Sequence, residues 1–122
     1  MLNVLIVDDE RILTDAYELS LTKAGFKVFI ANAPEDGIDI AVKEKPEVIV
    51  LDMLMPQMNG IEFLKALKKK MQLGKTKVLA FSNIENESVV QAAKKLGVVD
   101  YLLKVNYTPH QLADLIEMEL RK

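Results

Sequence analysis

Apolar residues gather in five short runs along the chain, and longer segments with helical spacing of apolar and polar residues lie between them. Most runs are rich in β-branched or aromatic side chains. Continuous rather than alternating hydrophobicity indicates strands that are buried on both faces, as in a parallel sheet. The predicted strands are residues 4–7, 28–30, 48–51, 78–81 and 101–103, and the predicted helices cover roughly residues 11–24, 34–44, 60–71, 86–96 and 109–121.

The strict alternation of strands and helices predicts an α/β fold with right-handed crossovers and helices on both faces of the sheet, a three-layer sandwich. Residues with special backbone preferences agree with these boundaries. Gly25 and Gly97 each follow a predicted helix and suit the left-handed position after its last turn. Pro34 and Pro109 stand where the first helical residue belongs. Residues 108–111 have the pattern of a capping box before the last helix.

Length and composition narrow the class of protein. The chain has 122 residues, which fits one domain, and it has no cysteine, which excludes disulfides and thiolate metal sites. A net charge of −2 argues against a general nucleic-acid binder. The apolar runs are too short to cross a membrane, and residues 1–3 lead straight into a strand without a secretory signal. We therefore expect a small cytoplasmic domain, with no direct binding of nucleic acid and no membrane partner.

Chemically useful side chains follow four of the five predicted strands. Residues 8–10 (DDE) follow the first strand, Asp52 the third, Ser82 and Asn83 the fourth, and Lys104 the fifth. The second strand ends in residues 31–32 (AN), which offer less. In a parallel sheet, functional groups gather outside these carboxyl ends.

Taken singly, each of these residues has a simpler explanation. An acidic pair after a strand is usually a turn or helix cap, Ser82 could cap a helix, and Lys104 could be a solvated strand end. Taken jointly, these explanations weaken, because unrelated polar residues have no reason to occupy the same edge of the sheet.

The chemistry of this edge favours a hard cation and phosphate. Carboxylates held close together repel one another unless a cation compensates, and an all-oxygen donor set favours Mg²⁺. Lys104 supplies a compact positive charge and Ser82 a hydrogen-bond donor, both suited to phosphoryl oxygens. Asp52, central in this group, is our candidate nucleophile toward phosphorus, forming an acyl phosphate.

With these residues in order, the chain strongly resembles the receiver domain of two-component response regulators over nearly its whole length. The matching parts are residues 5–10 (LIVDDE), residues 48–56 (VIVLDMLMP), Gly60, Ser82 and residues 100–104 (DYLLK). The resemblance implies a flavodoxin-like (βα)5 sandwich with a five-stranded parallel sheet in the order 2-1-3-4-5. Two helices are then expected on one face and three on the other.

The resemblance also assigns roles to individual residues. Asp52 resembles the phosphoacceptor, which takes a phosphoryl group from a histidine kinase or a histidine phosphotransfer protein. Ser82 and Lys104 resemble the phosphate-sensing pair, and Tyr101 resembles the aromatic switch. The implied Mg²⁺ ligands are Asp8, mainly through water, Asp9, Asp52 and the backbone carbonyl of Leu54.

The chain departs from the family pattern near the site. Receivers usually follow the lysine with a cis-proline, but here Val105 follows Lys104. Because a cis bond to a residue other than proline costs about 3 kcal/mol, we expect a trans bond with a remodelled loop or a strained exception. Asn83 replaces a small residue and is expected to narrow the mouth of the site. Apolar Leu54 and Ile84 flank the entrance and are expected to hinder an attacking water, which predicts a long-lived phosphoryl group.

Two surfaces have expected roles. The helix over 11–24 has two apolar rows, residues 12, 16 and 19 and residues 13, 17 and 21, of which one is enough for a core. Either both rows are buried, or one is left for a partner. By resemblance, this helix and the loop after the fifth strand dock the kinase. The fourth helix, fifth strand and fifth helix would form an output face that dimerises or binds a target protein.

The sequence thus predicts a phosphorylation-operated signalling switch without separate substrate turnover. Residues 1–122 are expected to form one receiver domain with no output domain, whether a stand-alone regulator or part of a longer one. One alternative is an Mg²⁺-dependent aspartyl phosphohydrolase. That class has its nucleophile after the first strand and a second aspartate two residues later, but here Glu10 stands at the second position. The other is a pseudo-receiver that is never phosphorylated.

Overall fold

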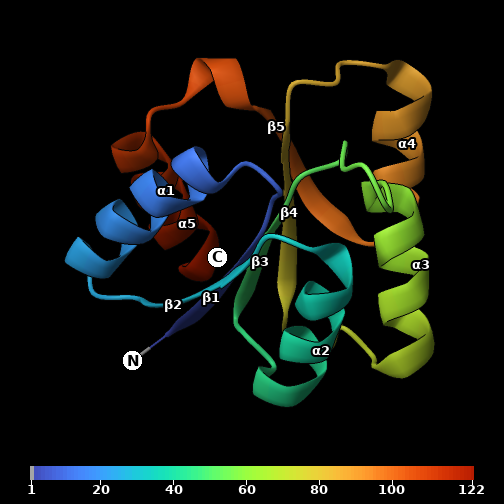
Figure 1. Ribbon diagram of the computed structural model, residues 1–122, viewed down its shortest axis with the longest axis horizontal. Coiled ribbons are helices and arrows are strands. Elements are labelled where there is room, and N and C mark those ends of the chain that lie inside the picture. Colours follow the sequence, from blue (N-terminus) through green and yellow to red (C-terminus); the bar gives the residue numbers. More distant parts are fainter. Residues whose placement is uncertain (1) are drawn as a thin grey trace.

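The computed structural model describes residues 2–122, and Met1 lies outside the described residues. One parallel sheet forms the centre of the molecule, with its strands in the order β2-β1-β3-β4-β5 (Figure 1), as predicted. The strands are β1 (Asn3–Val7), β2 (Lys27–Ala31), β3 (Val48–Leu51), β4 (Lys77–Ser82) and β5 (Val98–Leu103).

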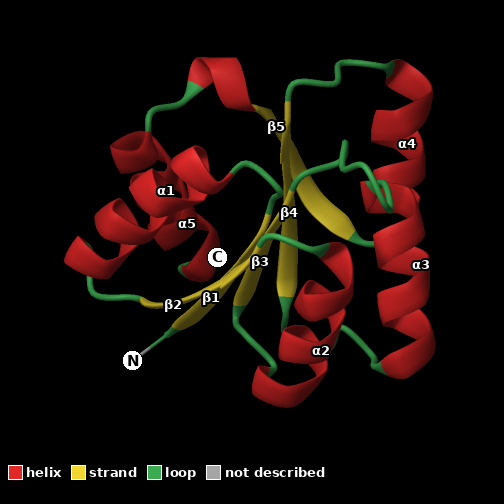
Figure 2. Ribbon diagram, in the orientation of Figure 1, coloured by secondary structure: helices red, strands yellow, loops and turns green. Residues whose placement is uncertain are grey.

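Helices cover both faces of the sheet (Figure 2). Helices α1 and α5 pack together on one face, whereas α2, α3 and α4 form a row on the other. The three-layer sandwich is therefore confirmed. The helices are α1 (Arg11–Lys23), α2 (Pro34–Glu44), α3 (Gly60–Lys70), α4 (Glu87–Lys95) and α5 (Pro109–Leu120), and a short 3-10 helix, η1 (Lys104–Asn106), precedes α5.

The sheet separates two apolar cores. Successive side chains of a strand point to opposite faces. In β1, Val4 and Ile6 therefore join the core under α1 and α5, whereas Leu5 and Val7 join the core under α2 and α3. All four side chains are buried. The central strands must be apolar on both faces, which explains the unbroken runs in the sequence.

Most helix boundaries follow the expected residues. Gly25 and Gly97 have φ angles of 97° and 107°, and Pro34 and Pro109 begin their helices. The capping box before α5 is present, with the side chain of Thr108 accepting from the backbone of Gln111 and that of Gln111 accepting from the backbone of Thr108. These contacts satisfy backbone donors that an uncapped helix leaves free.

The fifth strand begins earlier than predicted. It starts at Val98, not Tyr101, and it includes Asp100 within its length. This strand lies at the edge of the sheet, where Val99 is half exposed. Because an edge strand need not be apolar throughout, the hydrophobic run marks only its last part.

Helix α1 leaves one of its apolar rows at the surface. Tyr17 and Leu21 are buried against the sheet, but Ile12 is 86% exposed and Leu19 is 59% exposed. Of the two possibilities in the sequence, the structure thus supports the one in which part of the helix remains free. Over residues 2–122, no helix combines the length and the apolar character that a membrane crossing requires.

Candidate functional site

Two buried carboxylates meet where β1 and β3 end. Asp8 directly follows β1 and Asp52 directly follows β3, and these strands are neighbours with Val7 paired to Leu51. The backbone N–H of Asp52 donates to the carbonyl of Val7 at 2.9 Å, which extends the pairing into the loops. Asp8 is 2% exposed and Asp52 is 5% exposed. The parallel register therefore places them side by side at one edge of the sheet.

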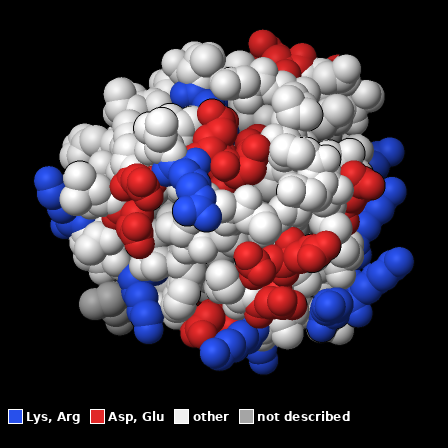
Figure 3. Space-filling view, viewed as in Figure 1, with Lys and Arg blue, Asp and Glu red and all other residues white. Residues whose placement is uncertain are grey.

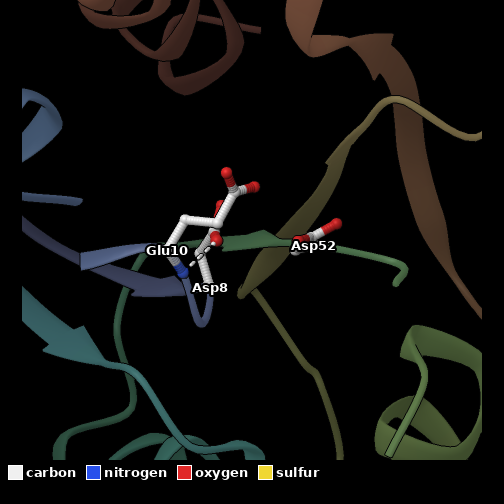
Figure 4. Close-up of side chains that lie close together, drawn as sticks. All are labelled: Asp8, Glu10 and Asp52. Carbon is white, nitrogen blue, oxygen red and sulfur yellow. Dashed lines mark hydrogen bonds between the residues drawn. The ribbon is translucent and has the colours of Figure 1, made fainter. Parts of the chain in front are cut away.

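Glu10 completes a group of three carboxylates. One carboxylate oxygen of Glu10, one of Asp8 and one of Asp52 all lie within 4.8 Å of one another, and Figure 4 shows the three side chains. The backbone N–H of Glu10 donates to Oδ1 of Asp8 at 2.9 Å, drawn as a dashed line in Figure 4. This bond folds the loop so that the side chain of Glu10 returns toward Asp8.

Lys104 enters this group from the end of β5. Its Nζ lies 2.6 Å from Oδ2 of Asp8, 3.1 Å from Oε1 of Glu10 and 3.2 Å from Oδ2 of Asp52. The lysine is 8% exposed and Asp52 is 5% exposed, but the side chain of Glu10 is half exposed. Among the described residues, the buried ammonium of Lys104 therefore compensates three carboxylates. Of these three, Glu10 is the one whose side chain is also exposed to solvent.

Burial and charge act in opposite directions on these groups. Burial raises the pKa of Asp8, and the hydrogen bond from Lys104 lowers it less than burial raises it. Burial alone would lower the pKa of Lys104, but the hydrogen bond and charge of Asp8, helped by Asp52 and Glu10, raise it. The site thus carries a firmly protonated lysine beside carboxylates whose negative charge is not fully compensated.

Asp9, expected among the Mg²⁺ ligands, does not belong to this carboxylate group. The group contains Asp8, Glu10 and Asp52, whereas Asp9 is half-buried beside it. Sequence reasoning gave Glu10 no separate role. The sequence signal that could have indicated a role for Glu10 is its position two residues after Asp8, because a residue at that spacing can lie on the same side of the loop. The ligand role of Asp9 and that of the Leu54 carbonyl stay predictions.

A small cavity of about 160 Å³ opens beside Asp52. The buried hydroxyl of Ser82 accepts a hydrogen bond from the backbone N–H of Ile84 at 3.3 Å, and Oδ1 of Asp52 accepts from that of Leu54 at 3.1 Å. The loops after β3 and β4 therefore both border this opening. The cavity is lined by Glu10, Asp52, Leu54, Ser82, Asn83, Ile84 and Lys104.

Tyr101 lies at the far side of the same loop. Its hydroxyl donates to the carbonyl of Ile84 at 2.9 Å, and burial raises its pKa. Tyr101 is thus linked through its hydroxyl to the segment between β4 and α4, which directly follows Ser82. A contact of this kind couples the hydroxyl end of the site to the edge strand.

The segment after Lys104 adopts the first of the two expected forms. All peptide bonds among the described residues are trans, so the bond from Lys104 to Val105 is trans. The chain turns directly into η1, closed by a hydrogen bond from the N–H of Tyr107 to the carbonyl of Lys104 at 3.2 Å. Val105 is 78% exposed on this turn.

The donor set suits a hard divalent cation. Buried and half-exposed carboxylates supply only oxygen, the donor type that Mg²⁺ prefers, and the group holds more negative than positive charge. Acidic side chains also dominate the middle of the face in Figure 3, whereas most basic ones lie near its rim. The site is therefore of the acidic kind that accepts Mg²⁺.

Comparisons with known proteins agree with this geometry. A model of the response regulator receiver domain matches residues 4–117. The chemotaxis protein CheY4 of Vibrio cholerae is 29% identical, with a TM-score of 0.87 over 97% of this chain and 98% of that one. A CheY-like receiver domain protein from Methanospirillum hungatei JF-1 has a TM-score of 0.90 at 23% identity, over 99% of this chain and 94% of that one.

A receiver domain protein from Clostridium thermocellum gives a similar result, with a TM-score of 0.83 at 25% identity over 99% of this chain and 95% of that one. These three matches cover 97–99% of this chain. The acidic pocket, the lysine at the end of β5 and the match over residues 4–117 lead to one assignment. The chain belongs to the response regulator receiver domain family of two-component signalling.

Proposed function

We propose that the protein is a phosphorylation-operated switch in which Asp52 accepts a phosphoryl group from a histidine kinase or a histidine phosphotransfer protein. The observation that carries the proposal is the surroundings of Asp52. Its buried carboxylate lies 3.2 Å from Nζ of Lys104 and borders the cavity that Ser82 also lines. Members of this family are generally phosphoacceptors rather than enzymes that turn over a separate substrate.

The transfer needs a carboxylate that can reach phosphorus while the charge of the phosphoryl group is compensated. An oxygen of Asp52 forms the new bond to phosphorus, and the bond from phosphorus to the donor's imidazole nitrogen breaks with its electron pair leaving on that nitrogen. Lys104, whose raised pKa keeps it charged, is placed to bind one phosphoryl oxygen. The hydroxyl of Ser82 is placed to donate to another.

Asp8, Asp9, Asp52 and the carbonyl of Leu54 are the residues we assign to Mg²⁺. When bound, the cation neutralises the charge that builds up on the transferring phosphoryl oxygens. Asp8 is already buried beside Asp52 by the register of β1 and β3, so it needs no large movement to serve the cation. Glu10 adds negative charge at the rim of the same group and favours cation entry.

The conformational change would extend from the phosphoryl group to the edge of the sheet. Lys104 and Ser82 move toward the phosphoryl oxygens, and the loop of Ile84, to which Tyr101 donates, moves with Ser82. The face built from α4, β5 and α5 then changes shape. We expect this face to form a homodimer or bind a target protein, and phosphorylation to shift an equilibrium between existing states.

The exposed row of α1 is our proposed docking surface for the phosphodonor protein. Ile12 and Leu19 are exposed apolar residues on this helix, and Val105 on η1 is exposed as well. Helix α1 follows the loop that carries Asp8, and η1 begins at Lys104. A partner bound to these two elements is thus held near the opening to Asp52. We also infer that the chain forms a single receiver domain.

One experiment separates this function from its alternatives. The protein is incubated with MgCl₂ and acetyl phosphate, and both its intact mass and the released phosphate are followed. The proposal expects one added phosphoryl group per chain, abolished by Asp52→Asn, with phosphate released no faster than the modified protein decays. A phosphorylation-independent module gains no mass. A phosphohydrolase releases phosphate over many turnovers, which would contradict the proposal.

A further inference from the structure

The side chain of Asn32, at the end of β2, holds the loop that carries the acidic residues. Its amide nitrogen donates to the backbone carbonyl of Asp8 at 2.8 Å and to the hydroxyl of Thr14 at 3.1 Å. Asn32 is half-buried, Thr14 is buried, and the backbone N–H of Asp8 donates to the carbonyl of Ala31 at 3.0 Å. One amide thus joins the end of β2, the end of β1 and the first turns of α1.

The contacts of Thr14 extend this link around the loop. Its hydroxyl donates to the carbonyl of Arg11 at 3.1 Å, and its backbone N–H donates to the carbonyl of Glu10 at 3.0 Å. The main chain from Asp8 to Arg11 is therefore tied to Asn32 at one end directly and at the other through Thr14. Glu10, which precedes α1, makes no side-chain cap hydrogen bond to that helix.

We propose that Asn32 is a positioning residue for the cation site: its amide fixes the main chain of Asp8, and with it the loop that presents the Asp8, Asp9 and Glu10 carboxylates. The inference rests on the proposed function, since it assumes that this loop holds Mg²⁺. Asn32 carries no charge and is not one of the assigned ligands. It acts through the loop, not on the phosphoryl group.

The physical reason lies in the crowding of like charges. Asp8 and Glu10 repel each other and Asp52, and among residues 2–122 Lys104 is the one cation that forms ion pairs with them. Without a fixed main chain, the loop can relieve this repulsion by turning a carboxylate toward solvent. The cation would then have to reorganise the loop before binding. Residues that orient metal ligands through hydrogen bonds typically contribute ten- to hundredfold to metal affinity.

The test compares Mg²⁺ affinity in variants of the full chain by isothermal titration calorimetry with MgCl₂. Asn32→Ala and Asn32→Leu both remove the amide that makes the two hydrogen bonds. Leucine also keeps nearly the same side-chain size. Thr76→Ala is the matched control. The hydroxyl of Thr76 donates to the carbonyl of Pro46 at 2.7 Å, so it also links two loops through a backbone carbonyl, but before β3 and β4, at the opposite end of the sheet.

Both Asn32 variants should raise the dissociation constant for Mg²⁺ at least tenfold, whereas Thr76→Ala should leave it within twofold of wild type. Hydrogen exchange of the metal-free protein supplies a second readout. Residues 8–11 should exchange faster in the Asn32 variants and unchanged in Thr76→Ala. Should either Asn32 variant fold poorly, Thr14→Val is the alternative. It keeps the shape of the side chain but removes the hydroxyl that accepts from Asn32 and donates to the carbonyl of Arg11, and it should weaken Mg²⁺ binding severalfold.

Two negative results are distinguishable. If wild type binds Mg²⁺ and the Asn32 variants bind it equally well, Asn32 only packs the loop, and the inference alone is overturned. If wild type does not bind Mg²⁺, the proposed function fails first, and the positioning role fails with it.

Discussion

At the scale of single residues, Lys104 is the group on which the unphosphorylated site depends. Its ammonium contacts Asp8, Glu10 and Asp52, two of which are buried. A buried charge that loses its partner is costly, whereas a buried pair is nearly neutral compared with apolar residues. The net contribution of the lysine to stability is therefore small. Its removal is costly because it leaves two buried carboxylates without a compensating charge.

Replacing Lys104 with Met, which has a similar shape and no charge, should lower the free energy of unfolding of the metal-free protein by about 3 kcal/mol. The raised pKa of Lys104 gives this difference a pH dependence. Its contribution is complete below the unfolded-state pKa near 10 and is lost as the pH rises through the folded-state value. Urea unfolding of both proteins from pH 7 to 11 measures it. A difference that is absent at pH 7, or that is lost well below pH 10, would contradict this role.

If Asp52 accepts a phosphoryl group as proposed, single residues also determine how long that group lasts. Leu54 is 64% exposed at the cavity beside Asp52, and Ile84 lines the same opening. Neither side chain can hydrogen-bond a water that attacks phosphorus. Leu54→Asn supplies such a group and should speed loss of the phosphoryl group severalfold, measured by intact mass after removal of the donor. Equal decay of the two proteins would show that Leu54 does not limit attack by water.

Single residues also show where sequence reasoning stops. Asp8, Asp52, Ser82 and Lys104 could be predicted to share one edge of the sheet, because each follows a parallel strand. The contact of Glu10 with Lys104 and the bridge from Asn32 to Asp8 could not. Both contacts depend on how one loop folds back toward residues that are distant in the sequence. Hydrophobic periodicity does not predict such loop conformations.

At the scale of elements, α1 combines a buried and an exposed apolar row. Tyr17 and Leu21 hold the helix against the sheet, so the exposed Ile12 and Leu19 are free for a partner. The double substitution Ile12→Ser and Leu19→Ser should slow phosphotransfer from the cognate kinase at least tenfold. Transfer from acetyl phosphate should not change, because the small donor does not touch this helix.

Met118 on α5 provides a matched control for this prediction. It is 62% exposed and apolar, but it lies on α5, which we assign to the output face. Met118→Ser should leave both transfer rates unchanged. If the α1 variant and the α5 variant behave alike with the kinase, the docking surface is wrongly placed.

Elements could be predicted well where burial dictates the residue type. Strands β1, β3 and β4 are buried on both faces, so their apolar runs almost coincide with their bounds. The start of β5 was missed because an edge strand tolerates Asp100. The end of α2 at Glu44 agrees with the helix predicted over 34–44, although Lys45, not a glycine, adopts the left-handed conformation there, with φ of 46°.

At the scale of the whole molecule, the sheet order decides which groups can meet. Strand β1 lies between β2 and β3, so the loop after β1 is flanked by Asn32 on one side and Asp52 on the other. Lys104 arrives from β5 at the sheet edge and reaches across β4 and β3 to the same loop. The site is thus assembled from residues spread over almost the full length of the chain, and its cation should stabilise the entire fold.

Magnesium should therefore raise the melting temperature. A cation that binds only the folded chain at about 100 times its dissociation constant adds about 2.7 kcal/mol, which corresponds to a rise of roughly 5 °C or more. Scanning calorimetry with MgCl₂, against NaCl at equal ionic strength, measures this rise. Asp8→Asn should diminish it. A melting temperature that does not respond to millimolar Mg²⁺ would show that the carboxylate group is not a metal site.

The most direct test of the central claim is a crystal structure with MgCl₂ and beryllofluoride, a stable mimic of the phosphoryl group. We predict beryllium bonded to a carboxylate oxygen of Asp52, with Nζ of Lys104 and the hydroxyl of Ser82 contacting its fluorines and Mg²⁺ beside Asp8. Lys104 would then have left Glu10. Beryllofluoride at another residue, or Mg²⁺ bound while Asp52 stays unmodified at saturating beryllofluoride, would contradict the phosphoacceptor role of Asp52.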